Sequence, residues 1–341
     1  MLRRKSFLRL IHLMLCVFLL LGFHSRALFR PGDYYFDLES DGMRTYYVMM
    51  YHTADLSAPD FKFRGMNYPF GENLNYMDAL PLVTVLFRAG GRMGWQMPSI
   101  PGFLNLTMLL SIPIASILLL EILFRYARPS LLSVIFALGT AFTMPQIHRI
   151  YHHFGLGFLF VIPLFWFLFL KMREADKSLS GKGKVTASSV IFRLFIVFLT
   201  IAAAFVHFYY AFFSAILIGF LTAMNRTSWR RRALDFFVLA AIPMGIVRLL
   251  LFLSGDGRTD RISRPYGSFG RNYYSSPGDI FLPNYKSTFW EIAWRPWHLG
   301  TWEGEAFVGF AVIFILFIFI YFARRKKREG TLKKRIFQSF Y

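Results

Sequence analysis

Cysteine is almost absent from this chain, and so are the short motifs of nucleotide-driven enzymes. The only cysteine among the 341 residues is Cys16, so no disulfide can form within the chain. The sequence has no P-loop, no glycine-rich dinucleotide fingerprint after a strand, no Gly-x-Ser-x-Gly elbow and no Cys-x-x-Cys pair. ATP-driven transport and nicotinamide chemistry therefore have no support in the sequence.

Acidic residues are also scarce, because 19 Asp and Glu face 39 Lys and Arg, which gives a formal net charge of +20. In a soluble protein, such a basic balance would suggest binding to nucleic acid. Here, however, 55% of the residues are hydrophobic, and Lys and Arg cluster at the ends of long apolar runs. This pattern predicts an all-α integral membrane protein without a nucleic-acid partner.

About eight apolar runs reach or approach the length of ~20 residues that spans a bilayer. We expect membrane-spanning helices at residues 8–28, 104–125, 130–147, 155–172, 190–206, 209–225, 233–253 and 305–323. The first run lacks a clean small-x-small cleavage site at its end, which favours an uncleaved anchor over a signal peptide.

The distribution of basic residues predicts the orientation of these helices. Lys and Arg gather in the segments that an inside N-terminus would leave in the cytoplasm, including the tail at 324–341. The long loops at 29–103 and 254–304 are close to neutral or acidic. By the positive-inside rule, both termini are cytoplasmic and both long loops lie outside. Residues 1–341 are expected to form a single polytopic membrane domain.

The first long loop is expected to contain helices that do not cross the membrane. The segment Ala79–Phe87 is too short to cross, so it is either a re-entrant segment or an interfacial helix. The later run at 190–225 is interrupted at His207-Phe208-Tyr209-Tyr210, which predicts two helices joined by a tight turn. An earlier interfacial helix is predicted by apolar side chains at helical spacing: Met43, Tyr46, Tyr47, Met50 and Ala54.

Carboxylates are concentrated at the start of this loop, directly after the first apolar run. Asp37 and Asp41 are the candidate catalytic residues, because a carboxylate can deprotonate an acceptor hydroxyl at the membrane surface. If a divalent cation takes part in the reaction, these two residues are also its expected ligands. The alternative is structural, with Ser40 or Asp41 capping the N-terminus of the interfacial helix.

Basic and imidazole side chains occupy a second loop that faces the same compartment. An arginine beside histidines suits a phosphate or pyrophosphate, whereas the alternative is that these residues cap helix ends. Arg248, inside an apolar run, either binds the same anion or extends to the interface. Glu303 either contacts the substrate or marks the start of the last run. The candidates in the second loop are His148, Arg149, His152 and His153.

The inside N-terminus and the acidic first outer loop resemble the GT-C superfamily of membrane glycosyltransferases. Several segments are similar to motifs of bacterial multi-pass proteins in that group: Asn67-Tyr68-Pro69-Phe70-Gly71, Tyr76-Met77-Asp78-Ala79-Leu80-Pro81-Leu82, Pro145-Gln146-Ile147-His148-Arg149, His153-Phe154-Gly155-Leu156 and Glu303-Gly304-Glu305-Ala306-Phe307-Val308-Gly309. The resemblance implies a location in the bacterial cytoplasmic (inner) membrane, a polyprenyl-phosphate-linked sugar donor and a catalytic acid at Asp37 or Asp41. Proteins of that group usually carry more than eight helices, so a minimal or truncated version is expected.

The resulting hypothesis is a transferase that moves a sugar from this lipid carrier to a glycan, lipid or protein acceptor on the extracytoplasmic face. The residues expected to hold the donor are Arg149, His153, Arg248, His148 and Glu303. Two alternatives remain: a non-enzymatic carrier or flippase of envelope lipids, and a non-catalytic subunit that needs a membrane partner. The spans contain few polar groups at mid-membrane depth, which favours surface chemistry over a carrier.

Overall fold

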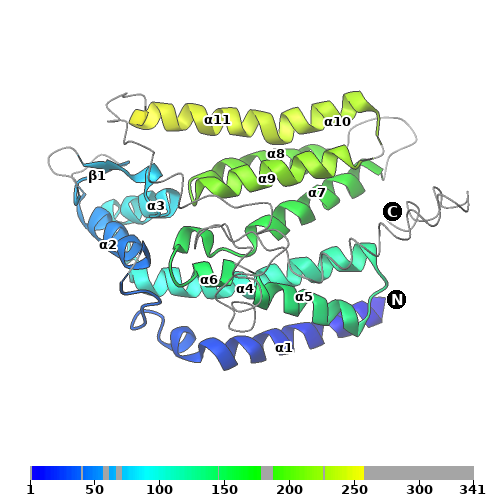
Figure 1. The fold of residues 1–341 in the computed structure, drawn as a ribbon, viewed down its shortest axis with the longest axis horizontal. Coiled ribbons are helices and arrows are strands. Elements are labelled where there is room, and N and C mark those ends of the chain that lie inside the picture. Colours follow the sequence, from blue (N-terminus) through cyan, green and yellow to red (C-terminus); the bar gives the residue numbers. More distant parts are fainter. Residues whose placement is uncertain are drawn as a thin grey trace, which may run out of the picture. The chain divides into compact units, whose positions relative to one another are not determined.

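The computed structural model describes residues 2–39, 41–56, 61–66, 71–144, 146–177, 187–225 and 227–256. These segments belong to one compact unit, Met1–Gly257, and most of them are helical (Figure 1). The predicted span at 305–323, the loop after residue 256 and the basic tail lie outside the described residues.

Long apolar helices dominate the described part of the chain. Five stretches of helix are long and apolar enough to cross a membrane, and two further apolar helices are shorter. The fold is therefore that of an all-α integral membrane protein. The helices concerned are α1 (Leu2–Phe29), α4 (Ile100–Tyr126), α5 (Leu131–Thr143), α7 (Val161–Lys177), α8 (Ala187–Ala204), α9 (Phe208–Ala223), α10 (Trp229–Phe236) and α11 (Ile242–Leu251).

The last of these crossings is one continuous helical stretch with two π-helical turns. The turn η3 (Phe237–Ala241) joins α10 to α11, and η4 (Phe252–Asp256) follows α11. Helix α4 packs against α1, α5 and α7, and α8 packs against α7, α9 and α11, so consecutive helices form a bundle (Figure 1).

The interrupted run at 190–225 folds as two helices, as predicted. Helix α8 ends at Ala204 and α9 begins at Phe208. His207 is the N-cap of α9, because its Nδ1 atom accepts a hydrogen bond from the backbone N–H of Tyr209 at 3.3 Å.

One end of the bundle carries the elements of the first long loop, and we call it the site end. The loop forms α2 (Asp41–Ala54), a short antiparallel pair of β1 (Lys62–Phe63) and β2 (Glu72–Asn73), the single turn η1 (Leu74–Tyr76) and α3 (Pro81–Arg92). Several hydrogen bonds attach these elements to the bundle, and two of them illustrate this. The backbone N–H of Leu82 donates to the carbonyl of Phe205 at 2.7 Å, and Asn75 Nδ2 donates to Ser254 Oγ at 2.9 Å.

The predicted interfacial helix forms as α2, and most of its apolar stripe is not covered by protein. Met43, Tyr47 and Met50 are exposed, and of the predicted set only Tyr46 is buried. The buried face instead carries small and polar residues such as Gly42, Thr45 and His52, together with Val48 and Met49. This buried face packs on the polar site and on α3, and the apolar stripe lies on the other side of the helix.

The opposite end of the bundle, which we call the basic end, holds ion pairs between helix termini. Arg9 of α1 lies 2.6 Å from Glu121 of α4, and Arg125 of α4 lies 2.7 Å from Glu174 of α7. The N-terminal end of α1 and the start of α10 lie at this end (Figure 1).

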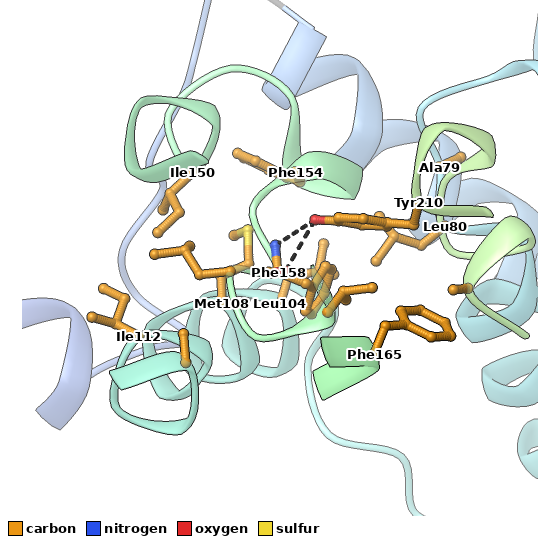
Figure 2. Close-up of a cluster of buried hydrophobic side chains, with 14 of the residues drawn as sticks. Ala79, Leu80, Leu104, Met108, Ile112, Ile150, Phe154, Phe158, Phe165 and Tyr210 are labelled. Atoms are coloured by element: carbon orange, nitrogen blue, oxygen red, sulfur yellow. Dashed lines mark hydrogen bonds between the residues drawn. The ribbon is translucent and has the colours of Figure 1, made fainter. Parts of the chain in front are cut away.

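Beneath the site end lies a cluster of buried apolar side chains (Figure 2). Tyr210 enters this cluster from α9, where its hydroxyl accepts a hydrogen bond from the backbone N–H of Phe158 at 3.0 Å and lies 3.2 Å from the Phe158 carbonyl. Leu80, Leu104 and Phe154 are fully buried nearby, so loop, α4 and η2 (Phe154–Leu156) share one core. This core gives the polar site above it a packed support.

Candidate active site

Asp37 organises the start of α2. Its carboxylate accepts hydrogen bonds from the backbone N–H groups of Glu39 at 3.1 Å and Gly42 at 3.0 Å. A Cβ atom on Gly42 would lie 2.6 Å from Asp37 Cβ, so only glycine allows this close approach. The predicted helix cap is therefore present, but Asp37 supplies the acceptor, while Asp41 is the first residue of the helix.

A second set of hydrogen bonds holds the acidic loop and α2 against α4. The hydroxyl of Tyr46 donates to Asn105 Oδ1 at 2.5 Å, and Asn105 Nδ2 donates to the carbonyls of Pro31, at 2.8 Å, and of Tyr34. Asn105 is completely buried, so its side chain connects α2 and the loop before it through a single satisfied amide.

The acidic loop meets the histidine loop, although more than a hundred residues separate them in the chain. His153 Nδ1 lies 3.3 Å from Asp41 Oδ2, and His152 Nδ1 lies 3.6 Å from Asp37 Oδ2. The side chain of Asp41 is 51% exposed, whereas that of Asp37 is only 7% exposed. Asp41 is thus the accessible carboxylate of the pair.

Asp78, just before α3, is the third carboxylate of the site. Its Oδ1 atom accepts a hydrogen bond from the backbone N–H of Gly155 at 3.1 Å, and its Oδ2 atom lies 3.7 Å from His153 Nδ1. Oδ2 is buried and has no hydrogen-bond partner among the described residues. A buried acceptor in this state is costly unless a cation or a donor lies close by, and His153 is the group in that position.

Thr45 lies between the backbone segments that carry Asp41 and Asp78. It lies one turn after Asp41 on α2, and its hydroxyl is 3.0 Å from the Asp41 carbonyl and within hydrogen-bond distance of the Asp78 carbonyl. The hydroxyl hydrogen can donate to one of these carbonyls at a time. The position of Asp78 relative to α2 is therefore fixed by contacts that do not involve its own side chain.

Gly155 and His207 close the inner side of the site. A Cβ atom on Gly155 would overlap Asp78 Oδ1 and lie 2.7 Å from His207 Cδ2. The backbone of the histidine loop approaches Asp78 this closely because residue 155 has no side chain.

The two inner histidines have opposite tendencies to carry charge. Asp78 raises the pKa of His153 most, Asp41 adds to this effect, and burial and Arg149 oppose it. The pKa of His207 is lowered, chiefly because it is buried. The surroundings of His153 therefore favour its cationic form, whereas those of His207 favour the neutral form.

The structure brings together Asp37, Asp41, His152 and His153, which the sequence singled out. Arg149 lies in the short helix α6 (Gln146–Arg149), near enough for its charge to lower the pKa of His153. His148 lies in α6 as well. Arg248 is exposed near the C-terminal end of α11, and Glu303 lies outside the described residues.

Within the described ranges, no group of three or more His, Cys, Asp or Glu side chains could hold a metal ion. A divalent cation bound by Asp37 and Asp41 thus remains a prediction.

The sequence alone assigns no role in the site to Asp78, Thr45, Gly155 or His207. The segment around Asp78 is one of the motifs that carry the resemblance. A single acidic residue shortly before an apolar helix that begins with proline is the sequence feature that points to Asp78. The glycine at 155 gave a weaker signal, since its role depends on a partner 77 residues away in the chain.

These features define a polytopic α-helical membrane protein with a polar carboxylate and histidine site at one end of its helices. The chain belongs to the family described as a domain of unknown function (DUF6311), whose sequence model matches residues 12–340. No curated protein and no solved structure matches the chain.

Proposed function

We propose that this protein is a membrane glycosyltransferase that uses a polyprenyl-phosphate-linked sugar on the extracytoplasmic face. The observation that carries the proposal is the contact of Asp41 with His153 Nδ1, near which the carboxylate of Asp78 also lies. An accessible carboxylate beside a cationic group is the combination needed to activate an acceptor hydroxyl next to a phosphate.

Asp41 is the better candidate for the general base. Asp37 is buried and both of its oxygens accept backbone hydrogen bonds at the start of α2, so its carboxylate is already used. The side chain of Asp78 is only 17% exposed, and its Oδ1 atom holds the backbone of Gly155. Asp41 is half exposed, so it can reach a proton on an incoming hydroxyl.

The proposed step balances without a further reactant. The acceptor oxygen forms a bond to the anomeric carbon of the sugar as the bond from that carbon to the phosphate oxygen breaks. The acceptor proton passes to the Asp41 carboxylate, and the bonding electrons leave with polyprenyl phosphate. The charge that develops on the phosphate needs nearby cations.

His153 and Arg149 supply positive charge next to the carboxylates, and Arg248 is proposed as a third contact to the donor phosphate. Asn75 and Asn73 contact Ser254, which follows Arg248 by less than two helical turns. These contacts support a position for Arg248 at the site end of the bundle.

The orientation is part of the proposal. The basic end carries Arg3, Arg4 and Lys5 at the start of α1 and Arg230, Arg231 and Arg232 at the start of α10. By the positive-inside rule, this end faces the cytoplasm of a bacterial inner membrane, and the site end faces outward.

The proposal is tested by incubating the purified protein with a panel of polyprenyl-phosphate sugars and candidate acceptors. Free polyprenyl phosphate is measured because it is the product whatever the sugar or acceptor. The protein should release it, Asp41→Asn should lower the rate by about 10²–10⁴-fold, and Asp33→Asn in the same loop should not. Donor that is bound but never cleaved by the parent protein would support a lipid carrier instead.

Substitutions of Arg248 test whether this residue binds the donor phosphate or only extends to the membrane interface. A guanidinium forms two parallel hydrogen bonds to a phosphate, whereas an ammonium acts as a point charge. Arg248→Lys should weaken retention of polyprenyl phosphate by roughly 1–2 kcal/mol, and Arg248→Leu should abolish it. Equal retention by all three forms would remove Arg248 from the site.

A further inference from the structure

A groove lies at the basic end, between the C-terminal half of α9 and the start of α10. Its volume is about 520 Å³, within the range of small-molecule sites. The residues that line it are Gly219, Thr222, Ala223, Trp229, Arg232, Ala233 and Phe236. The lining is thus largely apolar and contains one cationic side chain.

The missing side chain of Gly219 keeps this groove open. A Cβ atom there would lie 3.1 Å from Phe236 Cε2, so a larger residue would press against the opposite wall. Phe236 is 46% exposed and Trp229 is 68% exposed. In a membrane protein, aromatic surfaces of this kind at the end of a span lie against lipid at the level of the headgroups.

Arg232 holds its charge at the edge of the groove. Its Nη1 atom donates to the carbonyl of Ala223 at 3.0 Å, in the last turn of α9, so its position is fixed. The guanidinium carbon of the neighbouring Arg230 lies 5.9 Å from the ring centre of Trp229. Arg230 thus contacts the ring of Trp229, whereas Arg232 lines the groove together with Trp229.

The third arginine of this run has a different role. Arg231 Nη2 lies 3.6 Å from Asp176 and its Nε lies 3.4 Å from Asp235. Arg193 of α8 joins the same two carboxylates, at 2.9 Å and 3.1 Å. This network holds α7, α8 and α10 together, and it leaves Arg232 as the arginine that lines the groove.

We propose that this groove binds one anionic phospholipid, with its phosphate beside Arg232 and an acyl chain along Gly219 and Phe236. Basic side chains next to a span attract anionic headgroups. The apolar lining distinguishes a lipid from a soluble anion, since only an amphiphile satisfies both parts of the groove. The site lies at the end of the bundle opposite Asp41, so the inference does not depend on the proposed glycosyl transfer.

The test uses full-length protein purified in detergent, with phosphatidylglycerol and phosphatidylcholine as probes and native mass spectrometry to count retained lipids. The parent should retain one phosphatidylglycerol and little phosphatidylcholine. Arg232→Gln should weaken retention about tenfold, the scale of one charge-assisted hydrogen bond. Ala233→Leu, an exposed position on α10, should weaken it similarly by filling the groove while suiting a helix.

Arg92→Gln is the matched control, because this arginine also donates to a backbone carbonyl, that of Leu56, but lies in α3 at the site end. It should retain phosphatidylglycerol like the parent. Equal retention of the two lipids by the parent, or no loss in Arg232→Gln, would overturn the proposal. A loss in Arg232→Gln without a loss in Ala233→Leu would show charge attraction at the surface and would also overturn it.

Discussion

The substitution Asp37→Asn tests whether Asp37 stabilises the fold while Asp41 acts as the general base. In the parent, the two oxygens of Asp37 accept one backbone N–H each, from Glu39 and Gly42, and the side chain is nearly buried. Asparagine keeps one acceptor oxygen but places an amide NH₂ group against the other N–H. One hydrogen bond to a charged acceptor is therefore lost, which costs about 2 kcal/mol.

A loss of this size lowers the midpoint of thermal unfolding by roughly 3 °C, because the unfolding entropy grows with chain length at about 2.1 cal/mol/K per residue. The assay is thermal unfolding of the purified protein in detergent, with Asp33→Asn as the control because Asp33 is exposed in the same loop. Below the unfolding transition, turnover of Asp37→Asn should stay within about tenfold of the parent. This limit lies below the range expected for loss of a general base.

Two results would refute this assignment of Asp37. An unchanged midpoint would show that the carboxylate does not stabilise the start of α2. A normal midpoint combined with a loss of turnover of about 10²-fold or more would make Asp37, rather than Asp41, the base.

Three further predictions concern the packing, the charge and the orientation of the site. Gly155→Ala should lower both stability and turnover, because its Cβ would overlap Asp78 Oδ1; an unaltered midpoint and rate would contradict the packing described. The raised pKa of His153 stabilises the fold fully below its unfolded pKa of about 6.5, and this contribution is lost as pH rises through the folded value. Between about pH 6 and pH 8, His153→Gln should therefore lose less thermal stability than the parent. Parallel stability profiles of the two proteins would refute the raised pKa of His153. In a Cys16→Ser background, Lys62→Cys should react with a membrane-impermeant maleimide in intact cells and Arg128→Cys should not, and the reverse pattern would invert the orientation.

The helices of the bundle could be predicted from the sequence because each depends on local composition. Apolar runs located them, and His207 marked the division between α8 and α9. The orientation of α2 could not be predicted in the same way. Its periodicity indicates an apolar stripe containing Met43 and Met50, but it does not indicate the second face, which packs against Asp37 and α3.

The site was only partly predictable for a similar reason. Asp37, Asp41 and His153 could be identified as candidates because acidic residues and histidines are infrequent in this basic, apolar chain. Asp78 contacts Gly155 and His153 only in the folded protein, where the segment before α3 lies against η2. No local pattern contains that information.

The measurement that tests the central claim most directly is a single turnover of donor already bound to Asp41→Asn. If Asp41 takes the proton of the acceptor, this variant should bind a polyprenyl-phosphate sugar as tightly as the parent. Its transfer to an added acceptor should be slower by about 10²–10⁴-fold. Transfer at the parental rate, with donor binding intact, would contradict the assignment of Asp41 as the base.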